Sequence, residues 1–256
     1  MTDPLAPFLD RPIAHRTLHD LANGRPENSW EGLAAAMALN LPVEVDLQLS
    51  RDGVPMVFHD EDLDRLTAET GRVDARDAAE LSAIPLVGGQ RGIPRFDEFM
   101  THVAGGVPVL VELKDQDGAL GPKHSVMEAA VCDILRGYDG AVAVMSFNPH
   151  MIARCAELAP DLPRGLVTDP FLTEDWPEVD ALRRAQLAEI PDYEEVGACF
   201  ISHNVKYLED KAVAGVTRAG GRVFCWTVRC AEQEAEARRI AQNITFEGYI
   251  PEGVGT

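Results

Sequence analysis

The chain has 256 residues, 46% of them hydrophobic and 25% charged, a composition typical of a globular protein with a sizeable hydrophobic core. Its formal net charge of −19 argues against nucleic acid or an anionic membrane surface as a partner. No apolar run reaches the roughly 18 residues that a membrane-spanning helix needs. A small molecule is the expected partner, and it can be anionic, because a local cation reverses the field within one pocket. The oligomeric state is left open.

The cysteines and the start of the chain indicate a reduced, cytoplasmic protein. There are five cysteines, an odd number, and no Cys-x-x-Cys pair, so neither a disulfide framework nor a zinc site is predicted. Residues 1–12 lack the basic start and apolar stretch of a secretory signal. We therefore expect a cytoplasmic location.

Strand-like and helix-like segments alternate along the whole chain. Strands are expected at Pro12–His15, Val43–Leu47, Val54–His59, Val107–Lys114, Val142–Ser146, Arg164–Val167, Ala198–Ser202, Arg222–Val228 and Thr245–Ile250. Helices are expected in the alanine-rich residues 28–40, capped by Asn28 or Ser29, and at Phe96–Val103, Lys123–Arg136, Pro149–Leu158, Leu208–Arg218 and Ala231–Ile240.

This alternation predicts a parallel sheet with right-handed crossovers, either an open sheet or a closed barrel. Two features favour a single-domain (β/α)8 TIM barrel over residues 1–256. The length is typical of that barrel, and no glycine-rich dinucleotide loop follows the first strand. Nine strand candidates compete for eight positions. Because the turn sequence Ser-Arg-Asp-Gly joins Val43–Leu47 to Val54–His59, the second of these is interpreted as an extension or bend of the first.

Two of the expected strands carry acidic residues on one face. Side chains at positions i and i+2 share a face, so Glu44 and Asp46 point together while their valine and leucine neighbours point into the helix layer. In the same way Glu112 and Lys114 share a face. All four lie toward the carboxyl ends of their strands, where barrel enzymes place their chemistry.

Three buried carboxylates at one rim are costly without a cation, because each ion loses several kcal/mol of solvation. Glu44, Asp46 and Glu112 offer oxygen donors only, which suits one hard divalent ion, Mg²⁺ or Ca²⁺. The alternative is ordinary ion pairing, for instance Glu44 with Arg16 or Glu112 with Lys114.

Two histidines end strands beside these acids. His15 and His59 fit a pair that exchanges protons near neutral pH. Arg16 and Lys114 can supply the positive clamp that a phosphoryl group needs. Taken singly, a histidine at a strand end is more often a hydrogen-bonded structural residue than a catalyst.

The order of these pieces resembles the N-terminal signature of the glycerophosphodiester phosphodiesterase family. That signature runs His-Arg, Pro-Glu-Asn-Thr, Glu-x-Asp, an Asp-Gly turn and His-Asp, and here it reads "AHR", "RPENS", "EVD", "RDG" and "FHD". Further matches are "VELK" at Val111–Lys114, "SF" at Ser146–Phe147 and "CWTV" at Cys225–Val228. The matching pieces span most of the chain.

The resemblance implies a TIM-barrel enzyme that hydrolyses glycerophosphodiesters to an alcohol and sn-glycerol 3-phosphate with a divalent cation. It implies the following roles: metal ligands Glu44, Asp46 and Glu112; acid–base residues His15 and His59; substrate contacts Arg16, Lys114 and Trp226; and Glu27 near the metal, as a possible second shell. Which histidine is the base and whether water or a neighbouring hydroxyl attacks stay open.

Two segments depart from the family pattern. Thr17 stands where the family usually has glycine, and the altered loop that follows contains His19 and Asp20. We expect His19 to be a surface residue, with an approach to the substrate as the alternative. Near the end of the chain, Glu247-Gly248 replaces the family's Asp-Gly, and the Thr-Asp that usually follows is absent.

Two other functions remain possible on this scaffold. One is a phospholipase D-like or sphingomyelinase D-like activity, against which the acidic composition and the lack of an amphipathic membrane segment count. The other is a non-catalytic barrel that binds phosphodiesters. A serine hydrolase is rejected because Ser146 lacks a Gly-x-Ser-x-Gly elbow.

Overall fold

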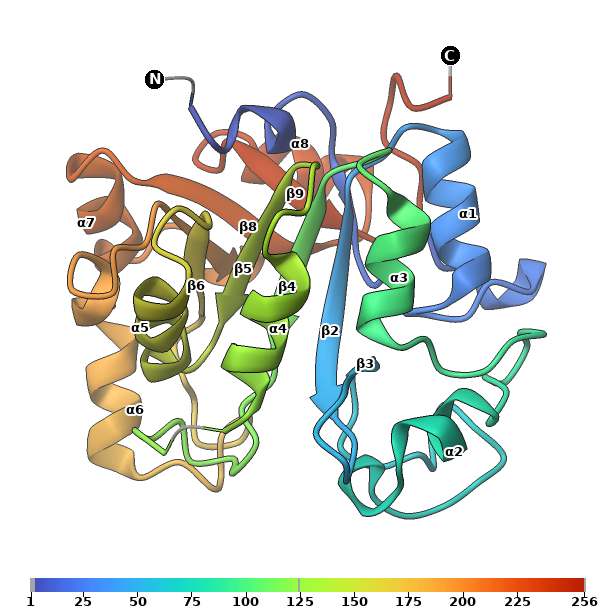
Figure 1. The fold of residues 1–256 in the computed structure, drawn as a ribbon. Helices are drawn as coiled ribbons and strands as arrows, with labels where there is room; N and C mark the ends of the chain where they lie inside the picture. Colours follow the sequence, from blue (N-terminus) through green and yellow to red (C-terminus); the bar gives the residue numbers. More distant parts are fainter. Residues whose placement is uncertain (1–2, 124, 256) are drawn as a thin grey trace.

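A computed structural model describes residues 3–123 and 125–255 and shows a closed barrel of parallel strands (Figure 1). Its strands are β1 (Ile13–Ala14), β2 (Val43–Leu49), β3 (Pro55–Val57), β4 (Val109–Leu113), β5 (Val142–Ser146), β6 (Arg164–Thr168), β7 (Phe200–Asn204), β8 (Arg222–Val228) and β9 (Asn243–Phe246). The short β1 pairs in parallel with both β2 and β9, which closes the barrel. The predicted TIM barrel is confirmed.

The surplus strand candidate is β3. It runs antiparallel to β2, with Leu47 opposite Val57, and forms a hairpin outside the parallel barrel order. The remaining eight strands form the barrel, as the turn sequence between these two segments indicated. Most strand ends lie within one or two residues of the prediction.

The prediction for the last strand was wrong in its bounds. The expected Thr245–Ile250 is observed as Asn243–Phe246. Gly248 has a φ of +76°, which an extended strand cannot continue through. Glu247 therefore lies in the loop directly after the strand, on the catalytic side of the barrel.

Helices cover the outside of the barrel. They are α1 (Trp30–Ala38), α2 (Ala78–Ser82), α3 (Phe96–Val103), α4 (Met127–Leu135), α5 (Pro149–Leu158), α6 (Ala181–Ala188), α7 (Lys211–Arg218) and α8 (Ala231–Ala237). Ser29 is the cap of α1, because its Oγ accepts from Gly32 N at 2.9 Å. None of the helices within residues 3–123 and 125–255 has the length and apolar character to cross a bilayer.

Several helices differ from the sequence predictions. The helices α4, α7 and α8 are shorter than expected, and the segment expected as Lys123–Arg136 includes residue 124, which lies outside the described residues. The helices α2 and α6 were not predicted. In α6 only Leu187 is buried, so the apolar period that reveals a helix in sequence is weak there.

The alternation of side chains on the strands builds two separate cores. Val43, Val45 and Leu47 of β2 belong to the large core between barrel and helices. Inside the barrel a smaller core includes Leu110 and Phe224. At the carboxyl-terminal end of the barrel interior the acids Glu44, Asp46 and Glu112 replace this apolar core, and that end holds the site.

Candidate active site

Three buried carboxylates meet at the carboxyl end of adjacent strands. Glu44 and Asp46 come from β2 and Glu112 from β4, where Asp46 and Glu112 are direct register partners. One carboxylate oxygen from each lies within 4.8 Å of the others, and all three side chains are buried. The structure thus brings together the three acids predicted as metal ligands.

Glu44 shows that this cluster needs a positive charge. Its Oε1 is buried and has no hydrogen-bond partner, while its Oε2 accepts from the backbone N–H of Arg16 at 3.0 Å. Burial, together with repulsion from Asp46 and Glu112, raises the pKa of Glu44 well above its usual value. An unpartnered buried oxygen in a set of oxygen donors fits a hard divalent cation.

Lys114 and Arg16 provide part of that charge. Lys114 Nζ lies 2.7 Å from Asp46 Oδ1 and 2.6 Å from Glu112 Oε1. Burial lowers the pKa of Lys114, but its two carboxylate partners outweigh this and raise it. Arg16 Nε is 3.5 Å from Asp46 Oδ2. The pairing of Glu112 with Lys114, considered as an alternative to metal binding, is present; Glu44 remains without an ionic partner among the Lys and Arg side chains of the described residues.

His15 faces the acids with one ring nitrogen and a carboxylate with the other. Its Nε2 is 4.0 Å from Glu44 Oε2, and its Nδ1 is 2.5 Å from Glu247 Oε2. Burial lowers the pKa of His15 in spite of the Glu247 hydrogen bond. Burial would raise the pKa of Glu247, but the hydrogen bond from His15, the nearby His19 imidazole and the charge of Arg229 keep it well below its usual value. An ionised Glu247 accepts from Nδ1–H, which leaves the Nε2 lone pair toward the cavity.

The β2–β3 hairpin places His59 beside the three acids. Phe58 N donates to Asp46 O at 3.0 Å, so the next residue lies beside the acidic end of β2. His59 Nδ1 is 2.7 Å from Asp60 Oδ1, and Asp60 in turn accepts from Arg65. Burial would raise the pKa of Asp60, but these two partners lower it. Both histidines are therefore oriented by a carboxylate through Nδ1.

The Pro-Glu-Asn segment supports the acids from one side. Glu27 does not contact the three carboxylates but pairs with Arg16 Nη1 at 2.8 Å and with Arg65. Asn28 was expected as a possible helix cap; instead it is fully buried and donates from Nδ2 to Asp46 Oδ2 at 2.9 Å. Its place in the family-like segment was the available signal for this role.

Aromatic side chains form the opposite wall of the cavity. Trp226 donates from Nε1 to Ser202 O at 2.9 Å, and its ring lies 5.6 Å from that of Phe147. The cavity holds about 150 Å³. The predicted site residues that line it are His15, Arg16, Glu44, Asp46, His59, Glu112, Lys114 and Trp226.

The sequence did not predict the roles of three residues that contact the site or lie beside it. Asp60 was not assigned a role, Glu247 was described only as a departure from the family pattern, and His19 was expected on the surface. His19 is instead partly buried, with Nε2 3.5 Å from Glu247 Oε2. The Asp that follows His in the "FHD" motif was a signal for Asp60; the contact of Glu247 joins residues 232 positions apart and has no local signal.

Known proteins resemble this chain over most of its length. The model of the glycerophosphoryl diester phosphodiesterase family matches residues 15–248. The glycerophosphodiester phosphodiesterase of Caldanaerobacter subterraneus subsp. tengcongensis is 28% identical over 226 residues, covering 84% of each chain. A phosphodiesterase of Oleispira antarctica, solved in complex with the product sn-glycerol-3-phosphate, has a TM-score of 0.76 at 23% identity and covers 94% of this chain and 93% of that chain. The glycerophosphodiester phosphodiesterase of Thermotoga maritima gives 0.68 at 19%, covering 92% and 94%.

The solved structures agree with the barrel fold, and the family match spans the acids, both histidines and Glu247. The chain belongs to the glycerophosphoryl diester phosphodiesterase family and is an enzyme that hydrolyses glycerophosphodiesters.

Proposed function

We propose that the cavity around Glu44, Asp46 and Glu112 releases an alcohol and sn-glycerol 3-phosphate from glycerophosphodiesters, with His15 and His59 as its acid–base pair. The observation that carries this proposal is the convergence of three acids and two carboxylate-paired histidines on one cavity. The product bound to the Oleispira antarctica relative supports the choice of product.

The three acids would hold one divalent cation, Mg²⁺ or Ca²⁺, because they offer only oxygen donors. Such an ion, when bound, polarises the phosphate and offsets charge that grows in the transition state. Lys114 and Arg16 add positive charge beside the same oxygens and orient the phosphate. Trp226 shapes the opposite wall, where the substrate lies against it.

His15 is assigned as the base, since its Nε2 lone pair faces the cavity while Glu247 holds the proton on Nδ1. His59, held by Asp60, then protonates the oxygen of the departing alcohol. The nucleophile is water or the neighbouring hydroxyl of the glycerol unit. The same contacts also fit the reverse assignment, with His59 as the base and His15 as the acid. The pH dependence of the hydrolysis rate in the His15 and His59 variants distinguishes the two assignments.

We also propose a cytoplasmic location. The described residues contain five free cysteines, of which Cys132, Cys155 and Cys225 are buried, and this pattern suits a reducing compartment. Labelling with a thiol reagent in denaturant, immediately after lysis of the source cells, checks whether these thiols are reduced there; unlabelled cysteines would contradict this location.

The test is hydrolysis of several glycerophosphodiesters followed by phosphorus NMR, with Mg²⁺, with Ca²⁺ and with EDTA. We expect release of glycerol 3-phosphate that EDTA abolishes. His15→Ala and His59→Ala should each lower the rate about 10²–10⁴-fold, the usual range for positioned acid–base groups. His102→Ala, an exposed histidine on α3, is the matched control and should keep its rate.

Three outcomes contradict the proposal. Choline release from intact phospholipids, without activity on deacylated ones, would indicate a phospholipase D-like or sphingomyelinase D-like enzyme. Binding of glycerophosphodiesters without turnover under any of the metals would indicate a non-catalytic barrel. Full activity of either histidine variant would remove that residue from the reaction.

A further inference from the structure

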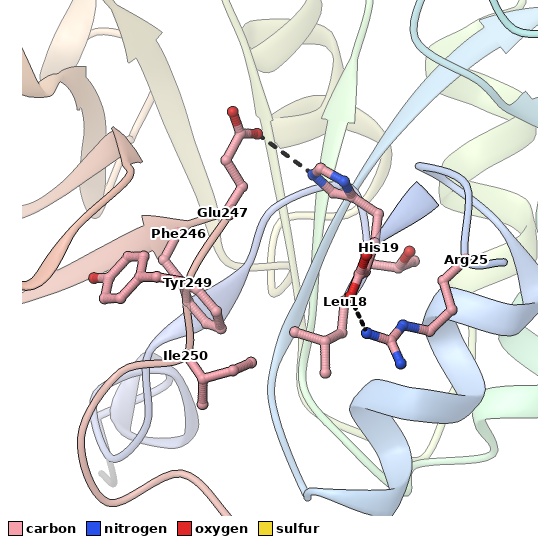
Figure 2. Close-up of a pocket in the computed structure, with 10 residues that line it drawn as sticks. Leu18, His19, Arg25, Phe246, Glu247, Tyr249 and Ile250 are labelled. Atoms are coloured by element: carbon pink, nitrogen blue, oxygen red, sulfur yellow. Dashed lines mark hydrogen bonds and ion pairs between the residues drawn. The ribbon is translucent and has the colours of Figure 1, made fainter. Parts of the chain in front are cut away.

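A second group of potential metal-binding side chains includes His15 and lies on the side of its ring that faces away from the three acids. It consists of His15, His19 and Glu247, each of which offers one ligand atom within 4.8 Å of the others. Figure 2 shows His19 and Glu247 pointing toward one another across the gap between the loop after β1 and the loop after β9. These two loops meet because β1 and β9 are neighbours at the closure of the barrel.

The atoms of this cluster lack enough partners of their own. His19 Nε2 is buried and makes no hydrogen bond, and its nearest charged neighbour is Glu247 Oε2 at 3.5 Å. The same Oε2 is 2.5 Å from His15 Nδ1, so one oxygen serves two imidazoles. Arg229 binds the other oxygen of Glu247, Oε1, at 2.7 Å and leaves Oε2 directed at the histidines.

The donor set differs in kind from the three-acid cluster. Two imidazole nitrogens and one carboxylate oxygen suit Zn²⁺ or a similar transition-metal ion, whereas Mg²⁺ and Ca²⁺ prefer oxygen alone. Ligands about 2.0–2.1 Å from a tetrahedral zinc ion lie roughly 3.3 Å apart. The three atoms lie within 4.8 Å of one another, and Glu247 Oε2 is 2.5 Å from His15 Nδ1 and 3.5 Å from His19 Nε2, so every pair is within about 1.5 Å of that spacing.

A separate cavity gives an ion access to this cluster. It holds about 310 Å³ and is lined by His19 and Glu247 together with Asp20, Tyr249 and other residues of the two loops (Figure 2). His15 lines the catalytic cavity instead. The cluster therefore lies between the two cavities, and the second has room for the water that completes a coordination shell.

We propose that His15, His19 and Glu247 form a second metal site, selective for Zn²⁺-like ions, that inhibits the enzyme. A cation bound at Nδ1 of His15 displaces the proton that Glu247 holds there, and the single proton of the neutral ring then resides on Nε2. Nε2 no longer has a free lone pair for a substrate proton. The inhibitory half of this inference rests on the proposed role of His15, whereas the metal-binding half does not.

Metal binding is measured first, without reference to activity. Wild type, His19→Asn and Glu44→Gln are dialysed against Zn²⁺, and Co²⁺ is titrated into each in excess Mg²⁺. We expect two zinc ions per chain in wild type and one in each variant. Co²⁺ should give a strong visible absorption, typical of a nitrogen-containing site of low coordination number, in wild type and Glu44→Gln but not in His19→Asn. His19→Gln replaces His19→Asn if the latter does not fold.

Inhibition is measured next, in saturating Mg²⁺, with each variant compared with its own zinc-free rate. Zn²⁺ should lower the wild-type rate at least 10-fold, and His19→Asn should need at least 10-fold more Zn²⁺ for the same effect. A zinc content that His19→Asn leaves as high as in wild type, or a Co²⁺ spectrum that His19→Asn leaves unchanged, overturns the site. Two zinc ions with undiminished hydrolysis overturn the inhibition alone. A wild type that binds both ions but hydrolyses nothing contradicts the proposed function and leaves the second site standing.

Discussion

At the scale of single residues, each histidine of the site depends on a carboxylate at its Nδ1. Glu247 holds His15 and Asp60 holds His59, at 2.5 and 2.7 Å. A carboxylate in this place fixes the tautomer and the ring orientation and stabilises the protonated ring. Neither carboxylate lines the catalytic cavity. We therefore assign both as positioning residues, which orient the histidines and do not contact the substrate.

We predict that Glu247→Gln lowers kcat about 10–100-fold, less than loss of His15 itself, because the ring remains but its tautomer is no longer held. KM should change little, since Glu247 does not line the catalytic cavity. Glu247→Asp, the residue that the family usually has here, should retain more activity than Gln. Steady-state kinetics of these variants are compared with Asp20→Asn, whose carboxylate pairs with Arg25 instead. An equal loss in Asp20→Asn would contradict the specific role of Glu247.

A different histidine, His203, contributes to the loss of stability in acid. His203 on β7 is buried, with Nδ1 2.8 Å from Thr168 Oγ1, and burial lowers its pKa from 6.5 to about 4. The unfolded chain therefore binds more protons than the folded chain between these values, and stability falls as pH decreases from about 6.5 to about 4.

The expected loss from His203 is about 3 kcal/mol across that interval. This loss is measured by urea unfolding of wild type and His203→Gln at several pH values. It is the difference between the two proteins in how far the free energy of unfolding falls from pH 6.5 to pH 4. The variant should lose less stability on acidification, whatever its stability at pH 7. Parallel curves for the two proteins would show that the pKa of His203 is the same in the folded and the unfolded chain.

At the scale of elements, the loop after β1 packs tightly against helix α1. Thr17 has a φ of +70°, a left-handed conformation that costs a β-branched residue roughly 1–2 kcal/mol. Glycine, which the family signature has at this position, adopts this conformation without that cost. The Thr17 side chain is buried against Gly32, where an added Cβ would lie 2.2 Å from Thr17 Oγ1.

We predict strong coupling between these two positions. Gly32→Ala alone should destabilise the protein by about 1–3 kcal/mol through overpacking. With Thr17→Gly present, the same alanine should be neutral or stabilising by up to about 1 kcal/mol, because alanine is the better helix former. Urea unfolding of the two single variants and the double variant completes the cycle. Additive free energies would mean that the loop moves away from the helix without cost.

At the scale of the whole molecule, the N-terminal segment closes the end of the barrel opposite the site. The short 3₁₀ helix η1 (Ala6–Phe8) lies at the top of Figure 1, whereas the β2 arrow points to the bottom. Leu5 and Phe8 are buried in the small core inside the barrel. Asn243 on β9 donates to Arg11 O at 2.7 Å and also binds Phe8 O, which ties the segment to the last strand.

We predict that Phe8→Ala lowers stability by about 3–5 kcal/mol, the usual cost of a large aromatic side chain removed from a core. At 20 °C kcat should remain within about twofold of wild type, because the change is at the far end of the barrel from the acids. Leu182→Ala, an exposed leucine on α6, is the matched control and should cost little. Loss of activity in a folded Phe8→Ala protein would show that the two ends of the barrel are coupled.

The sequence by itself was sufficient for the order of the strands and for the faces of β2 and β4. A strand alternates its side chains by backbone geometry alone, so Glu44 and Asp46 had to share a face wherever the strand was placed. The family-like order of residues then indicated which acids and histidines meet. Those predictions depend on local geometry or on residues that lie close together in the chain.

Only the tertiary structure decided which residues contact His15 and Asp46 from distant parts of the chain. Glu247 reaches His15 because β9 ends at Phe246 and pairs with β1, a contact between the two ends of the chain. His19 joins them because the loop after β1 folds back beside the same carboxylate, and Asn28 reaches Asp46 through a left-handed turn. These contacts follow from barrel closure and loop conformation, which depend on packing between distant segments and leave no periodic pattern in the sequence.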